Sequence, residues 1–346
     1  MPVIPPATHD LAPQSTGRLM DPHYRNPYTQ QINFGLQAAP NVHSVVEVEY
    51  VQVRSLHEDK TVNMNPLRYY SDGSRPFDAA FTAAGVPVLG RIADEASIGR
   101  SYYDALNLSY RQQMWKRITG TANYTWSKGL AFEGAAASFR NTATNPFLGQ
   151  FRRQDYGRSP NDETHHLTAS ATISLPWKID ISPLFQIGSG RPVDVFSSSD
   201  KWGVGSGRGN AHAIIPKGGK MNDFGSLTAL FNADGSAYSG TFYKNCLSAG
   251  TCEEVSYDTT GGQTFVELDA RIGKTITFGE RYNVNLFFQS FDLTNRANFG
   301  PNLQSNINSL DATDPSSFLK PTNFITPSST VTPQSFTGEF GARFSF

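Results

Sequence analysis

The chain has 346 residues, with 29 basic and 30 acidic side chains and a net charge of -1. This balance argues against a nucleic-acid-binding protein and against a general binder of anionic lipid, because both need a basic surface. The sequence contains no run of 18 apolar residues, which excludes a transmembrane helix. Its 30 glycines and 21 prolines favour turns and long loops over helices.

Two segments near the start of the chain alternate apolar and polar side chains. They are residues 31–37 (QINFGLQ) and 46–50 (VEVEY). A period of two predicts a β-strand with one apolar and one polar face. Pro40 and Asn41 lie between the segments and predict a short turn. The polar stretch that follows, about residues 55–100, is expected to form a long loop.

A second pair of strands is predicted at residues 106–111 (LNLSYR) and 122–127 (ANYTWS). The connection between them, QQMWKRITG, is short. The next stretch, about residues 129–163, has no alternation and is expected to form another long loop.

The third pair shows the clearest alternation. Residues 167–175 (LTASATISL) and 179–187 are the predicted strands, and Pro176 and Trp177 predict the turn between them. The longest expected loop follows, from about residue 190 to 262.

The fourth pair consists of residues 266–272 and 282–289, with a turn predicted at Gly279 and Glu280. A last loop is expected to reach about Pro333. The chain then ends in QSFTGEFGARFSF, a predicted strand of a length that suits a tilted crossing of a bilayer. Its apolar positions include four phenylalanines, namely Phe336, Phe340, Phe344 and Phe346.

About nine strands result, and short and long connections alternate along the whole chain. This rhythm is typical of a bacterial outer-membrane β-barrel, with short periplasmic turns and long outer loops. Aromatic residues near the strand ends fit the girdles at the two membrane interfaces. They are Tyr50, Tyr102, Tyr103, Trp115, Trp126, Trp177 and Tyr282. The alternative is a soluble β-sandwich, for which turns every 8–12 residues would be typical.

The polar parity of these strands predicts the lining of a wet barrel lumen. Solvated lumen charges explain its paired carboxylates better than acid–base catalysis does. The predicted lumen-facing residues are Glu47, Glu49, Asn107, Arg111, Asn123, Glu267, Asp269, Arg271, Asn285 and Gln289.

Other chemistry is weakly indicated. Cys246 and Cys252 could close a small loop as a disulfide in an oxidising compartment, or remain two free thiols. His165 and His166 follow Asp162 and Glu163, but adjacent histidines on a strand point to opposite faces, so a shared metal ion is not expected. No serine-hydrolase elbow or zinc-protease motif occurs. We therefore expect neither an enzyme nor a cofactor.

The chain resembles the C-terminal part of TonB-dependent outer-membrane receptors of the Oar-like type. The similar stretches keep their order and spacing over nearly the whole chain. They are NPYTQQINFGLQ (26–37), VVEVEYVQVRSLH (45–57), SYYDALNLSYRQ (101–112), GTANYTWSKGL (120–130), GRSPNDETHHLTASATISLPW (157–177), GSGRPVDVF (188–196), QSFDLTNRANFG (289–300) and the final GARFSF.

The resemblance implies a partial antiparallel transmembrane barrel, about nine strands of a 22-stranded one. Residues 1–26 are then expected to be a loop from the upstream barrel and residues 27–346 its C-terminal part. An odd strand number and a start without the features of a signal peptide lead us to expect further strands, a plug domain and a TonB box upstream of Met1.

The implied function is uptake of an unknown ligand across the outer membrane by the intact parent, driven through the plug and the TonB complex. Two further partners are implied, the lipid bilayer with its lipopolysaccharide and the barrel-assembly machinery. This machinery would recognise the four terminal phenylalanines. No nucleic acid is expected as a partner. The alternative is a soluble or surface β-rich binding module that holds carbohydrate through its aromatic residues.

Overall fold

The computed structural model describes most of the expected strands and part of the loops. The described residues are 18–65, 77–88, 92–132, 156–159, 161–193, 213–220, 222–234, 236, 238, 240–254, 260–279, 281–299, 318–321 and 335–346. The predicted loop 1–26 is therefore described from Arg18 onward, and most of the last loop lies outside this part.

One large sheet dominates the fold, and nine long strands follow one another in it in chain order from β2 to β15. Every pair of neighbours along this path is antiparallel. The nine strands are β2 (Tyr28–Asn41), β3 (Ser44–Asn63), β4 (Ala93–Trp115), β5 (Ile118–Phe132), β7 (His165–Leu175), β8 (Ile179–Gly188), β13 (Phe265–Phe278), β14 (Tyr282–Phe291) and β15 (Thr337–Ser345). The predicted up-and-down series of about nine strands is confirmed.

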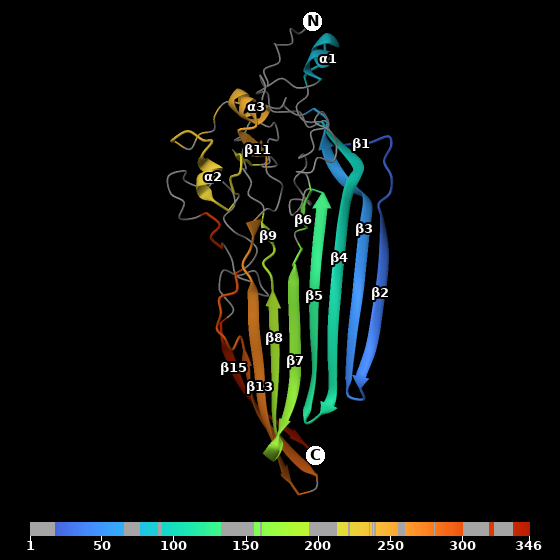
Figure 1. Cartoon of the computed structure of the whole chain (residues 1–346), viewed down its shortest axis with the longest axis vertical. Coiled ribbons are helices and arrows are strands. Elements are labelled where there is room, and N and C mark those ends of the chain that lie inside the picture. Colours follow the sequence, from blue (N-terminus) through green and yellow to red (C-terminus); the bar gives the residue numbers. More distant parts are fainter. Residues whose placement is uncertain are drawn as a thin grey trace.

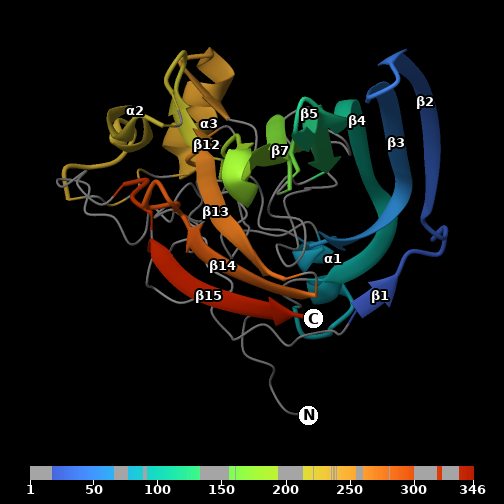
Figure 2. The ribbon, with the colours of Figure 1, turned by 90° about the horizontal axis from the view of Figure 1, so that it is seen from below.

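Two short strands extend the sheet beside this path. β1 (Arg18–Met20) pairs in parallel with β4, and β6 (Tyr156–Arg158) pairs with β5. Seen along its strands, the sheet is an open arch and not a closed barrel (Figure 2). Among the described strands, β2 and β15 each pair on one side only. All residues of β2 are exposed.

The two ends of the sheet differ. The tight connections β2–β3, β4–β5, β7–β8 and β13–β14 gather at one end, and helices α1 (Asp78–Ala83), α2 (Phe224–Thr228) and α3 (Gly240–Ala249) lie at the other (Figure 1). This asymmetry confirms the predicted alternation of short and long connections. No described helix has the length and apolar character that a bilayer crossing needs.

The first turn lies two residues later than predicted. β2 continues through Pro40 to Asn41, which pairs with Ser44 across a register shift. The Asn41 side-chain oxygen accepts a hydrogen bond from the His43 amide at 2.8 Å, an Asx turn that fixes the corner. Pro40 is tolerated because it lies at the register shift between Ala38 and Asn41, where the regular ladder is already interrupted.

The predicted loop at residues 55–100 is also too long. β3 continues to Asn63 and β4 already begins at Ala93, with register shifts between Leu56 and Glu58 and again before Lys60. The bulges break the alternation of side chains, so the strand pattern disappears from the sequence while the pairing continues. In the next predicted loop, β5 similarly extends to Phe132.

The predicted loop at residues 190–262 contains folded structure. Besides α2 and α3 it carries β9 (Pro192–Val193), β10 (Ile214–Pro216), β11 (Cys252–Glu254) and β12 (Thr260–Gly261). We call the described residues between 213 and 254 the cap. Its own core consists of Ala213, Ile214, Ile215, Leu227, Phe231, Tyr243, Cys246 and Cys252.

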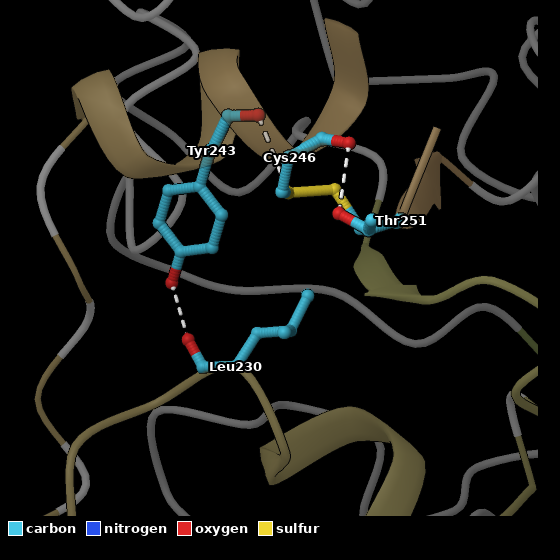
Figure 3. Close-up of a disulfide and its surroundings, with 5 residues drawn as sticks. Leu230, Tyr243, Cys246 and Thr251 are labelled. Atoms are coloured by element: carbon cyan, nitrogen blue, oxygen red, sulfur yellow. Dashed lines mark hydrogen bonds between the residues drawn. A yellow bond between two sulfur atoms is a disulfide. The ribbon is translucent and has the colours of Figure 1, made fainter. Parts of the chain in front are cut away.

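The cap is cross-linked by a disulfide between Cys246 and Cys252, whose Cα atoms lie 5.4 Å apart (Figure 3). The Tyr243 hydroxyl donates a hydrogen bond to the Leu230 carbonyl at 2.9 Å. Burial raises the pKa of the Tyr243 phenol to about 12. Phe318 and Leu319, from the connection between β14 and β15, pack against the same core.

Candidate functional site

A continuous polar row crosses seven neighbouring strands at one level of the sheet. Each member is the direct cross-strand partner of the next, so all of them share one face. In order from β2 to β13 the row consists of Gln37, Glu47, Ser109, Asn123, Thr168, Gln186 and Glu267. We call the face that carries this row the polar face.

The neighbouring row, one residue along each strand, is apolar throughout. Because side chains alternate between the faces of a sheet, this row lies on the opposite face, which we call the apolar face. Its members, in the same order, are Leu36, Val48, Leu108, Tyr124, Leu167, Ile187 and Val266. The sheet thus changes from polar to apolar across its own thickness over seven strands.

Hydrogen bonds tie the polar face together between β3, β4 and β5. The Asn107 amide donates to a carboxylate oxygen of Glu49 at 3.3 Å, and the Thr125 hydroxyl donates to the Asn107 carbonyl at 2.9 Å. A small pocket of about 120 Å³ lies beside this ladder, lined by Glu47, Arg111 and Asn123 among others. These groups are suited to hold water or a polar partner.

The same face continues on β13 and β14. Arg271 pairs with Gln289, and its guanidinium lies 3.9 Å from the centre of the Phe287 ring. Asn285 donates to the Thr275 hydroxyl at 3.0 Å. Asp269 accepts a hydrogen bond from the backbone amide of Asp292 at 2.8 Å. By register, all ten residues predicted to line a lumen therefore lie on the polar face.

A sheet with one polar and one apolar face, joined by tight turns at one end and long loops at the other, is the construction of a membrane β-barrel. The family model of the outer membrane β-barrel domain matches residues 2–331. The chain belongs to this family. Its location is accordingly the cell outer membrane, and the apolar face is the one that meets lipid.

One solved structure similar to this barrel domain is the outer membrane transporter YddB from Escherichia coli. The two share 10% sequence identity with a TM-score of 0.47, over 82% of this chain and 31% of that one. The barrel domain thus spans less than a third of the length of that transporter. No curated protein matches the sequence.

Of the four terminal phenylalanines, Phe340 and Phe344 lie on the apolar face by register, and the Phe346 ring lies 6.0 Å from that of Phe344. Phe340 faces Phe288 with ring centres 4.8 Å apart, and Phe344 stacks on Tyr282 at 5.8 Å. Phe340 and Phe346 are 87% and 93% exposed. Rings so exposed on a terminal strand are available to lipid or to another protein.

The two histidines at the outer rim have separate partners. His165 contacts the Tyr124 hydroxyl at 2.8 Å, whereas His166 contacts Glu163 at 2.9 Å. Arg191 lies 3.6 Å from the same glutamate. Within the described ranges, no group of three His, Cys, Asp or Glu side chains could hold a metal ion.

Sequence reasoning missed a polar cluster on the apolar face, near the middle of β3 and β4 and on the loop side of the apolar row. The Arg54 guanidinium donates to both carboxylate oxygens of Asp104, at 2.9 and 3.0 Å. The Tyr50 hydroxyl and the Gln52 amide also donate to Asp104. Only the change from apolar to polar residues along one parity, from Tyr50 to Arg54, could have revealed it. This cluster marks where the apolar band of the barrel domain ends.

Proposed function

We propose that this barrel domain is the C-terminal part of a TonB-dependent outer-membrane receptor of the Oar-like type. The intact receptor would take up a scarce ligand across the outer membrane and would perform no catalysis. The sequence resemblance supports the receptor class. The membership in the outer membrane β-barrel family supports the location in the outer membrane.

The observation that carries the proposal is the polar row across seven strands of an open arch. A barrel of 22 strands has a lumen wide enough to hold a plug. The plug would contact the polar face, and Glu47, Asn123 and Glu267 would hydrogen-bond it directly or through water. The free edges of β2 and β15 would pair with the remaining strands, so that no unpaired backbone meets the bilayer.

The soluble binding module is the weaker alternative. It would have to cover the apolar face, because exposed apolar patches of this extent are rare on soluble monomers. Leu36, Leu108 and Phe340 are exposed in the arch, and none of the described loops covers them.

Two measurements test the proposal. The reading frame upstream of Met1 should encode a plug, a TonB box and about 13 more strands, the remainder of a 22-stranded barrel. The intact protein, extracted from outer membranes in detergent, should bind the C-terminal domain of TonB, and removal of the TonB box should abolish this binding. A soluble protein that purifies without detergent would refute the proposal.

A further inference from the structure

A pocket of about 680 Å³ lies on strands β3, β4 and β5, about half-way along β3 and β4. Tyr50, Leu106 and Trp126 form an apolar part of its lining, and the charged residues Asp104, Lys128, Arg158 and Asp162 contribute to the rest. Tyr50, Asp104, Leu106, Trp126 and Lys128 share the parity of the apolar row. The pocket therefore opens on the apolar face, toward lipid, and not into a lumen.

Its position along the strands places it at the membrane interface. The pairs Tyr50–Leu106 and Leu106–Trp126 belong to the last apolar row, and Gln52, Asp104 and Lys128 form the next row toward the loops. Two residues along a strand correspond to about 7 Å. Tyrosine and tryptophan favour the headgroup level, and the long loops mark the extracellular side. The pocket thus spans the boundary between the acyl chains and the headgroups of the outer leaflet.

Of the positively charged side chains around the pocket, one has no ion-pair partner among the described residues. Arg54 is paired with Asp104, and Arg158 is paired with Asp162. Lys128 is exposed and forms no ion pair with any residue in the part of the chain that the structure describes. An ammonium group above an apolar floor is complementary to an anionic headgroup on an acyl chain.

We propose that this pocket binds a phosphate-bearing glycolipid of the outer leaflet, that is, lipopolysaccharide through its lipid A part. An acyl chain lies on Leu106 and Trp126, whose side chain is 54% exposed. A phosphate accepts hydrogen bonds from Lys128, and the Arg54–Asp104 pair holds the outer wall of the pocket in place. The site is a property of the barrel domain itself and does not depend on which ligand an intact receptor transports.

Native mass spectrometry of the full chain in detergent micelles tests this site. Diphosphorylated lipid A is the probe, and its dephosphorylated form is the comparison lipid. Lys128→Gln should weaken lipid A binding about tenfold, the loss expected for one charge-assisted hydrogen bond. Lys128→Arg should retain binding, and Trp126→Ala should weaken the binding of both lipids.

Lys274 offers a matched control. It is an exposed lysine on the same apolar face, paired with Ile179 and Leu286 near the tight turns at the opposite end of the sheet. Lys274→Gln should leave lipid A binding unchanged. Equal losses in Lys128→Gln and Lys274→Gln, equal binding of the two lipids, or displacement of lipid A by millimolar inorganic phosphate would each overturn the proposal. So would occupation of the pocket by a second copy of the chain, seen as a dimer that lipid A leaves intact.

Discussion

Leu108→Arg is the sharpest test of which face meets lipid. Leu108 belongs to the apolar row, with Val48 and Tyr124 as cross-strand partners, and 38% of it is exposed. Along the same parity of β4, polar residues occur four positions away on either side, at Asp104 and Gln112. At about 3.4 Å per residue the apolar stretch is about 27 Å long. Leu108 therefore lies at its centre.

The position sets the magnitude. With a strand tilt of about 40°, this stretch spans about 20 Å along the membrane normal, close to the apolar band of outer-membrane barrels. An arginine at the midplane of a lipid-facing surface costs about 2–4 kcal/mol of folding free energy. Asn107→Arg, one residue away on the polar face, should cost much less, because its guanidinium would extend into water beside Glu49.

The assay is denaturant unfolding of the full chain in lipid vesicles, followed by tryptophan fluorescence, with the free energy obtained by linear extrapolation. Leu108→Ala separates the loss of packing from the cost of the charge. Equal costs for Leu108→Arg and Asn107→Arg would refute the assignment of the faces, and a larger cost at Asn107 would reverse it.

Three further predictions concern the chain end and the cap. Deletion of Phe346, or Phe346→Ala, should lower the amount of protein assembled in the outer membrane, measured by quantitative blotting of membrane fractions; normal assembly would contradict a role of this residue in assembly. Cys246→Ser should destabilise the cap by about 2 kcal/mol, because the disulfide closes a short loop in the unfolded chain. Limited proteolysis should then cut the cap of the variant and spare the sheet. The unsubstituted chain should be cut in the same way only when reductant is present. Since the folded-state pKa of Tyr243 is raised to about 12, the stability of the cap should be constant below the unfolded-state pKa of about 10 and decrease as the pH rises from there toward 12. Tyr243→Phe should remove this pH dependence, as followed by proteolysis across the pH range; persistence of the dependence in this variant would exclude Tyr243 as its cause.

The strands that cross the membrane could be predicted well from the sequence. The β7–β8 pair follows the predicted segments within two residues at every end, because alternation is uninterrupted there and Pro176 marks the turn. Such regularity is a physical requirement, since each strand must present apolar side chains to lipid on one side and polar side chains to water on the other.

The regions beyond the bilayer could not be predicted in the same way. Beyond Leu56, β3 contains bulges, so neither alternation nor a constant register is kept there. The cap buries Ile214 and Ile215 side by side, a pattern that is not specific to a strand or a helix. Whether Cys246 and Cys252 form a disulfide depends on the distance between them in the folded chain, which the sequence does not contain.

The polar cluster around Asp104 was missed for a related reason. Gln52 and Arg54 occupy positions that the alternation assigns to the apolar face, and the predicted strand ends before them, at Tyr50. At the membrane interface, the lipid-facing positions of a strand change from apolar to polar side chains, although the strand itself continues.

The packing of Phe318 and Leu319 against the cap has a mechanical consequence. These residues belong to the connection between β14 and β15, whereas the cap belongs to the connection between β8 and β13. The two connections are separate in the chain but share one apolar core, so displacement of either one exposes the core of the other. A ligand that contacts only the cap would therefore also restrict the motion of the chain leading into the terminal strand. The two outer loops would therefore move together, attached to the four neighbouring strands β8, β13, β14 and β15, and the disulfide would keep the cap rigid.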